Sequence, residues 1–166
     1  EDKSGGVWFG TGGGGINRYD PLNQNFTHVQ HIPGNPASIS PNPVLAICED
    51  HLGNLWIGSD GGGINLKDKN SNEFKNDLQN RSFGSNAITA ICEDDKGNIW
   101  IGTKQGVLNK YNPATEKFLH FKLESTNSIE VSITTITQDK NGKLWIGTYS
   151  QGIFLFDPAT GKIKKW

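Results

Sequence analysis

Four groups of residues in this sequence have types and spacings that chemistry could use. They are the glycine string 10–15, the acidic pairs 49–50 and 93–94, the histidines His28 and His31, and the cysteines Cys48 and Cys92. Glycine strings can cradle phosphates, paired carboxylates can act as general acid and base, and imidazole or thiolate groups can hold a metal. Each of these chemistries depends on the elements that position the residues.

The local sequence argues against such chemistry in the first three groups. Residues 10–15 fit G-x-G-x-x-G, but a dinucleotide fingerprint also needs a helix at its third glycine, and residues 16–21 read as another strand. We therefore expect a turn. Neighbouring residues on a strand point to opposite faces, which separates Glu49 from Asp50, and each aspartate belongs to a turn. For the same reason His28 and His31, at i and i+3 on a presumed outer strand, cannot chelate as a pair.

The cysteines occupy the same slot in two innermost strands, just before the acidic residue. Equivalent points on neighbouring blades are expected to lie farther apart than the roughly 7 Å between Cα atoms that a disulfide tolerates. We therefore interpret Cys48 and Cys92 as small buried residues. No Ser-His-Asp set and no metal-ligand spacing stands out, so no catalytic residue, metal or cofactor is predicted.

The sequence repeats itself four times around a tryptophan, after 48, 44 and 45 residues, in words such as Leu55-Trp-Ile-Gly-Ser59. A glycine follows each tryptophan at the second position. The residues that define this structural repeat are Trp8, Trp56, Trp100, Trp145, Gly10, Gly58, Gly102 and Gly147.

Each repeat predicts four short strands separated by turn residues. The first covers residues 44–49, 88–93 and 133–138, and the second carries the tryptophan. The third covers residues 16–19, 64–67, 108–111 and 153–156, and the fourth centres on Phe26, Phe74, Phe118 and Ile163. The Asp-x-x-Gly words between the first two strands suit a type I turn that ends in a left-handed glycine.

A repeat of this length with four strands is typical of radially stacked blades. The predicted fold class is therefore all-β, a β-propeller fragment of about four four-stranded antiparallel blades. Residues 1–166 form one partial propeller with blades at approximately 1–34, 35–80, 81–124 and 125–166. The second strands are apolar on both faces, which suits sheets that are covered on both sides.

The first blade lacks its innermost strand, because Glu1-Asp2 holds the place where that strand ends in the other repeats. The chain also contains no Met, so we expect a processed form or an excerpt. A closed four-bladed ring with a borrowed strand and an arc of a larger ring remain two readings, and we favour the arc. Its partners would be the remaining blades of a larger propeller or a second copy of the chain.

Composition excludes several classes of function. Lys and Arg total 16 against 17 Asp and Glu, a net charge of -1 that provides no field to collect nucleic acid or anionic membrane. No apolar run of about 18 residues is present, so direct membrane insertion is not expected.

The repeated words resemble the two-component regulator propeller repeat over the whole chain. One repeat matches this pattern at Val44, Ile47, Glu49, Asp50, Gly53, Leu55, Trp56, Ile57, Gly58 and Ile64. Another matches at Ile133, Ile136, Asp139, Gly142, Leu144, Trp145, Ile146, Gly147, Thr148, Gly152, Ile153, Asp157, Pro158, Gly161 and Ile163. The fourth repeat departs at Gln138, where others have Glu, and at Phe154, where others have Asn.

The resemblance implies the periplasmic sensor region of hybrid two-component histidine kinases of Bacteroides-like bacteria, which often sense oligosaccharides. The kinase and DNA-binding parts would lie elsewhere in such a protein. We expect a non-catalytic, extracytoplasmic sensor segment that binds a ligand or relays its binding. A protein-interaction or structural propeller without a small-molecule ligand is the alternative, and an enzyme such as a propeller lyase is a third hypothesis.

Ligand contacts in a propeller are expected on the end faces of the ring. The loops between second and third strands and the links between blades vary most among the repeats. The candidate ligand-binding residues are Asp60, Lys104, Gln105, Tyr149 and Gln151, with Ser150 beside them. Tyr149 could stack on a sugar ring while Asp60, Lys104 and Gln105 bond its hydroxyls; ordinary solvated loop tips are the alternative reading.

Overall fold

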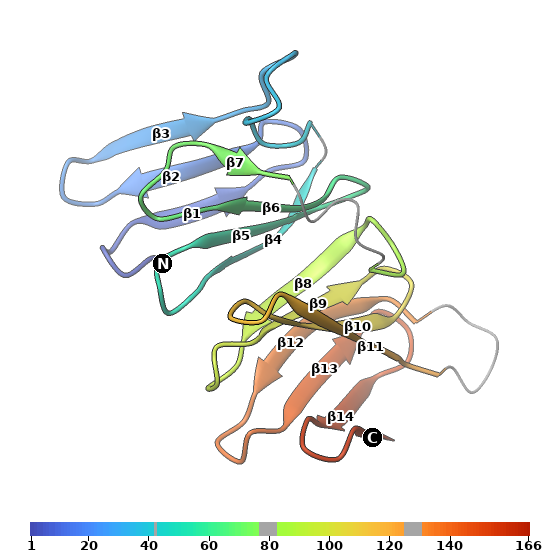
Figure 1. Cartoon of the computed structure of the whole chain (residues 1–166). Coiled ribbons are helices and arrows are strands. Elements are labelled where there is room, and N and C mark those ends of the chain that lie inside the picture. The colour runs from blue at the N-terminus through green and yellow to red at the C-terminus, as the bar shows by residue number, and fades with distance from the viewer. Residues whose placement is uncertain (42, 77–82, 125–130) are drawn as a thin grey trace.

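A computed structural model describes residues 1–41, 43–76, 83–124 and 131–166. These residues form fifteen strands, and none of them lies in a helix. The strands group into four antiparallel sheets that follow one another in chain order, with the first and last sheets at opposite ends of the stack (Figure 1). The expected all-β propeller fragment is confirmed, and we number its sheets as blades one to four.

Blade one holds β1 (Val7–Gly10), β2 (Ile16–Asp20) and β3 (Asn25–Val29). Blade two holds β4 (Val44–Glu49), β5 (Leu55–Ser59), β6 (Gly63–Lys67) and β7 (Phe74–Lys75). Blade three holds β8 (Ile88–Glu93), β9 (Ile99–Thr103), β10 (Val107–Asn112) and β11 (Lys117–Lys122). Blade four holds β12 (Ile133–Gln138), β13 (Leu144–Thr148), β14 (Ile153–Asp157) and β15 (Lys162–Lys165). In every blade consecutive strands pair, so each blade is a meander.

The turns between first and second strands have the expected form. Gly53, Gly97 and Gly142 have φ between 74° and 89°, a region that side chains with a Cβ rarely adopt. The N–H of each glycine donates to the carbonyl oxygen of the aspartate three residues before it, at 3.0 Å. The Asp-x-x-Gly word therefore specifies these hairpins locally.

Burial of the second strands follows the position of each blade in the stack. All five residues of β5 and of β9 are buried, because blades two and three are covered on both faces. In β1 and β13 some residues remain partly or fully exposed, because each belongs to a terminal sheet. The hydrophobic core accordingly lies in the seams between blades rather than within one sheet.

The repeated glycine of the second strand is required by close packing across a seam. A Cβ on Gly102 would lie 2.4 Å from Cγ2 of Ile133, at the start of the first strand of the next blade. Gly58 faces Ile88 in the same way at 2.6 Å, and Gly10 faces Val44 at 2.6 Å. Real Cβ atoms do not approach so closely, so only glycine fits here at this blade spacing.

Candidate functional site

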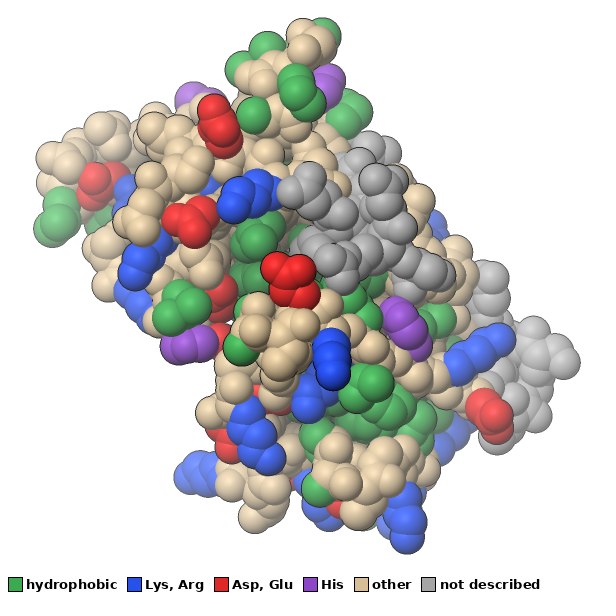
Figure 2. Space-filling view, in the orientation of Figure 1, with side chains coloured by type: hydrophobic (Ala, Val, Ile, Leu, Met, Phe, Trp, Pro, Cys, Tyr) green, Lys and Arg blue, Asp and Glu red, His purple; other side chains and the backbone are tan. Residues whose placement is uncertain are grey.

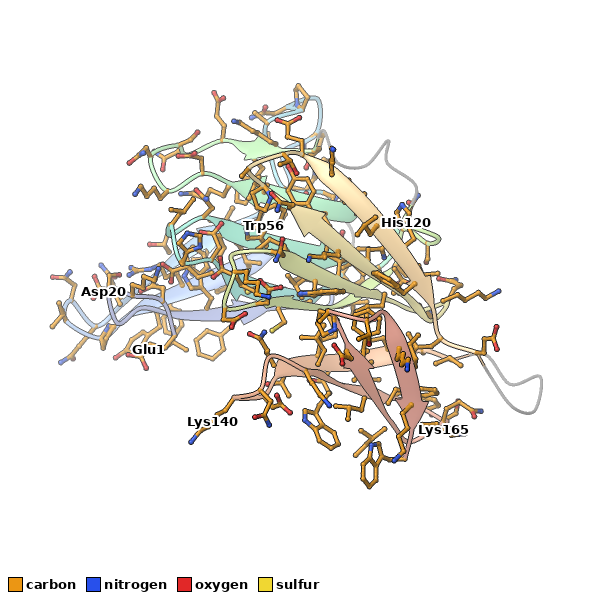
Figure 3. The ribbon with its side chains drawn as sticks, turned by 60° about the horizontal axis from the view of Figure 1, so that its bottom comes forward. Glu1, Asp20, Trp56, His120, Lys140 and Lys165 are labelled. Atoms are coloured by element: carbon orange, nitrogen blue, oxygen red, sulfur yellow. The ribbon has the colours of Figure 1, made fainter. Side chains whose placement is uncertain are left out.

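The two edges of the blades, where the strands begin and end, carry different kinds of residue. The turns from first to second and from third to fourth strand lie at one edge, which we call the turn face. The loops from second to third strand and the links between blades lie at the other edge, the loop face. In Figure 3, Glu1, Asp20 and Lys140 lie on the turn face, and His120 and Lys165 lie toward the opposite edge.

The predicted ligand-binding residues all lie on the loop face. The backbone N–H groups of Asp60, Lys104 and Tyr149 donate to the link just before the first strand of their own blade, at Pro43, Ala87 and Ser132. Lys104 and Gln105 are exposed, Asp60 is half-buried, and Tyr149 is 84% exposed. The loops are therefore equivalent in place but contributed by separate blades.

Gln151 differs from the other candidates because it is buried. Its Oε1 accepts a hydrogen bond from Nζ of Lys165 at 2.8 Å, and its backbone N–H donates to Oγ1 of Thr148 at 3.1 Å. In this conformation Gln151 braces its loop against β15. Its role in ligand binding stays a prediction, as do those of Asp60, Lys104, Gln105 and Tyr149.

On the turn face, one aspartate per blade holds the indole of the repeat tryptophan. In each blade the carboxylate accepts a hydrogen bond from the indole Nε1 six residues later, at 2.8–3.1 Å. The four aspartates are Asp2, Asp50, Asp94 and Asp139. Each also accepts two backbone N–H groups of its own turn. The aspartate thus joins the turn to the core.

These hydrogen bonds decide the protonation state of the aspartates. Burial of the Asp50 and Asp94 carboxylates raises the pKa, but hydrogen bonds from the tryptophan, the asparagine and the turn backbone outweigh burial and hold the pKa below its usual value of 3.8. The same holds for Asp2, where Arg18 adds its charge. Each carboxylate therefore stays ionised and holds both its own turn and the indole in place.

The other member of each acidic pair bridges two blades. Oε2 of Glu49 accepts the backbone N–H of Lys3 at 2.9 Å, and Oε2 of Glu93 accepts that of His51 at 2.7 Å. In the next seam Oε1 of Gln138 accepts the N–H of Asp95 at 2.7 Å. We call this repeated contact the seam lock. Sequence reasoning missed it, although the constant place of these residues, seven before the tryptophan, was the available signal.

The seam lock explains why the fourth repeat departs from Glu. In blade three the residue that donates its N–H in the seam lock is Asp95, whereas in blades one and two it is Lys3 and His51. Nε2 of Gln138 donates to Oδ1 of Asp95 at 2.9 Å, whereas a glutamate would place two carboxylates in contact. Gln138 is therefore matched to its neighbour in blade three.

The histidines and cysteines show no metal site. Nδ1 of His28 contacts Oδ1 of Asn17 and Nδ1 of His31 contacts the carbonyl oxygen of Ile39. The expectation that His31 lies on the outer strand was wrong, because β3 ends at Val29 where the chain turns into the link. Within the described ranges no cluster of three or more His, Cys, Asp or Glu could hold a metal ion.

Both cysteines are free thiols, as expected, but they are half-buried and not the fully buried residues that the sequence suggested. Burial raises the pKa of Cys48 to about 11 and also raises the pKa of Cys92. A thiol of this kind stays protonated at neutral pH and is a weak nucleophile.

Two cavities open at the turn face where blades meet. The larger, of about 460 Å³, lies between blades one and two and is lined by Asp2, Lys3, Ser4, Trp8, Arg18, Glu49, Gly53, Leu55, Lys67 and Lys69. The second, of about 380 Å³, lies between blades two and three and is lined by Asp50, His51, Leu52, Glu93, Lys96, Gly97, Asn112, Pro113 and Ala114. Neither cavity is lined by a residue that the sequence predicted to bind a ligand.

Comparison with known proteins agrees with this architecture. The sequence profile of the two component regulator propeller family matches residues 38–61, 82–105 and 127–150. No curated protein matches the sequence. None of the described residues belongs to a helix able to cross a bilayer.

Solved propellers resemble the whole chain. Two structures of the extracellular domain of BT4673 from B. thetaiotaomicron, described as a hybrid two component system in one case and a one component system in the other, are 26% identical to it. Their TM-scores are 0.73 and 0.79, and they align with 100% of this chain but only 23% of their own length. A streptogramin B lyase, 20% identical with a TM-score of 0.74, aligns over 100% of this chain and 52% of its own, and shares the fold. Three stretches of this chain therefore match the two component regulator propeller repeat, and its whole length resembles solved propellers.

Proposed function

We propose that this chain is a non-catalytic sensor segment of a hybrid two-component signalling protein, located in the periplasm. Three profile matches and the similarity to extracellular domains of such systems support the proposal. In this role the propeller binds an oligosaccharide or relays its binding. A ligand acts by stabilising one arrangement of the propeller over another, which biases the histidine kinase that such a protein carries.

The chemistry of the described residues is consistent with binding rather than turnover. The aspartates of the turn face are ionised and committed to indole and backbone donors, and the two thiols are held protonated. Exposed polar and aromatic groups, such as Tyr149, suit the recognition of hydroxyl-rich ligands.

Calorimetric titration of the extracellular region that contains this chain, against a panel of neutral and acidic oligosaccharides, tests the proposal. We expect one class of glycan to bind and to raise the melting temperature. Silence across a wide panel would exclude sugar sensing by this region.

The alternative, an interaction propeller without a small-molecule ligand, is favoured by one observation. The outer surfaces of blades one and four expose large apolar side chains, including Phe9, Phe26 and Ile153. They suit the remaining blades of a larger ring or a second copy of the chain. Recovery of a protein partner by pull-down, without any thermal shift from glycans, would favour this function.

A further inference from the structure

In two of the three seams, the repeat tryptophan of one blade packs against an aromatic ring of the next. The ring of Trp56 lies 5.6 Å from that of Tyr111, and the ring of Trp100 lies 5.4 Å from that of Phe156. Both partners hold the same place in the sheet, eleven residues after the tryptophan of their own blade, opposite the first residue of the second strand. The ring fills the seam and buries the tryptophan of the blade before it.

Blade two breaks this rule. Lys67 holds the equivalent place opposite Leu55, so an ammonium group replaces the ring that would face Trp8. Trp8 is only half-buried, whereas Trp56 and Trp100 are 2% and 0% exposed. Trp8 and Lys67 both line the 460 Å³ cavity, while neither Trp56 nor Tyr111 lines the cavity of the next seam.

A second departure of blade two lies in the same cavity. The turn after the third strand carries Pro21, Pro113 and Pro158 in the other blades, but Lys69 in blade two. The side chain of Lys69 extends beside Gly53, and its backbone N–H donates to Oδ1 of Asn54 at 3.2 Å. Lys67 and Lys69, the two residues at which blade two departs from the other blades, therefore line the same cavity.

The cavity carries an excess of positive charge in a chain whose net charge is -1. It is lined by four cations, Lys3, Arg18, Lys67 and Lys69, and by two carboxylates, Asp2 and Glu49. Both carboxylates already have partners. Asp2 accepts from Arg18, Trp8, Ser4 and Gly6, and Glu49 accepts the N–H of Lys3.

The cations that line the cavity differ in whether their charged groups already have partners. Nζ of Lys3 donates to the carbonyl oxygens of Asp50 and His51, and Arg18 pairs with Asp2. Among the described residues, no hydrogen bond or ion pair engages the ammonium groups of Lys67 and Lys69. Two available ammonium groups at one partly enclosed wall favour an anionic oxygen group.

We propose that this seam cavity binds a carboxylate-bearing sugar, with Lys67 and Lys69 holding the carboxylate. A volume of about 460 Å³ lies within the range of small-molecule sites. Trp8 and Leu55 supply an apolar wall for the ring, and Lys3, Ser4 and Glu49, which are hydrogen-bonded within the protein, line the rest of the cavity. The choice of a sugar rests on the sensor function proposed above, whereas the preference for an anion rests on the lysines alone.

Titration of the chain with galacturonate at low ionic strength, with galactose and acetate as comparison probes, tests the site. We expect galacturonate to bind more tightly than either comparison probe and to weaken as salt is added. Lys67→Tyr should weaken galacturonate binding by about tenfold or more. Because tyrosine is the residue that blade three uses at this place, this variant should fold at least as stably as the parent.

Control variants separate the outcomes. Lys69→Pro, which restores the residue of the other blades, should also weaken binding, while Lys96→Ala at the next seam should not. Equal binding of acetate and galacturonate would support an anion site but would overturn the proposal that its ligand is a sugar. Unchanged binding in Lys67→Tyr, or no galacturonate binding at all, would overturn the site. Neutral glycan binding that survives in Lys67→Tyr would leave the sensor function standing.

Discussion

At the scale of single residues, the tryptophan of each repeat can stabilise the fold in two ways, by packing its ring and by donating a hydrogen bond. In every blade its Nε1 donates to the aspartate that shapes the preceding turn, and the rings of Trp56 and Trp100 also fill a seam between blades. Trp100 is completely buried, whereas Trp145, on the outer blade, is half-buried beneath Trp166, whose ring lies 6.1 Å away. The same residue type is therefore expected to contribute unequally in different blades.

Trp100→Ala should lower the free energy of unfolding by about 3–5 kcal/mol, because it leaves a cavity and removes one of the hydrogen bonds that Asp94 accepts. Trp145→Ala should cost clearly less, since solvent already reaches this side chain. Urea denaturation followed by circular dichroism measures both. Equal losses would contradict the view that burial in a seam sets the contribution.

The depressed pKa values of Asp50 and Asp94 predict how stability depends on pH. A carboxyl whose pKa is lower in the folded state adds stability above its unfolded pKa, near 3.8, and loses it as pH falls through the folded value. We expect constant stability from these groups at neutral pH and a progressive loss below about pH 4. Asp94→Asn, measured by thermal melting from pH 7 to pH 2, should show a shallower acid loss; an identical profile would contradict this origin.

At the scale of elements, blade spacing is set by residues that allow close approach. First strands of blades two, three and four meet the second strands of the preceding blades at Gly10, Gly58 and Gly102, where any Cβ would collide with the neighbour. The seam lock then joins the same blades at the turn face. Packing and polar contacts therefore fix how each sheet is positioned against the next.

Gly102→Ala should destabilise the chain by about 1–3 kcal/mol, because the added methyl group overpacks against Ile133. Gly13→Ala is the matched control, since no atom lies within 4 Å of the Cβ it would add. Denaturant midpoints of the two variants measure the difference. A loss in Gly13→Ala as large as that in Gly102→Ala would point to backbone effects instead of the seam.

Gln138→Glu should destabilise the seam between blades three and four by about 1 kcal/mol at neutral pH, because it faces Asp95. The double variant Asp95→Lys with Gln138→Glu reproduces the pair found at Lys3 and Glu49, and should recover the stability. Thermal melting of the single and double variants gives the coupling between the two positions. Additive effects would show that the lock does not couple them.

At the scale of the whole molecule, charged side chains of both signs are interspersed over the surface (Figure 2). Large apolar side chains are exposed in every blade, including on the outward faces of the two outer sheets. Phe9 and Phe26 are about half exposed on blade one, and Ile153 is 48% exposed on blade four. Equivalent faces of inner blades bury these positions against a neighbour, so the exposed side chains of the outer faces are ones that a further sheet could cover.

We therefore expect the chain to associate through these faces at high concentration. Ile153→Lys should weaken the association by placing a charge on the outer face of blade four. Leu22→Lys, at a turn tip where the side chain is 86% exposed, should leave it unchanged. Sedimentation velocity over a range of concentrations measures the effect; a monomer at every concentration would contradict this prediction.

The sequence alone determined the strand order, the turns and the repeat, because each depends on local signals that recur in every blade. Trp56 and Gly58 identified the second strand, and Asp50 with Gly53 identified its turn. What the seams contain could not be predicted in this way. The seam lock, the match of Gln138 to Asp95 and the meeting of Lys67 with Trp8 join residues of adjacent blades, more than forty positions apart. Only the stacked sheets decide which of these residues face one another.

The candidate site shows the same division. Variation among the loops directed attention to Tyr149 and Lys104 on the loop face, where their roles stay predictions. Lys67 and Lys69 also vary, but they lie in strands and turns that look structural in the sequence. Their significance depends on a ring that is missing opposite Trp8. Sequence periodicity located the departures in blade two, and the tertiary structure showed that they share one cavity, because packing between sheets is not encoded within a single repeat.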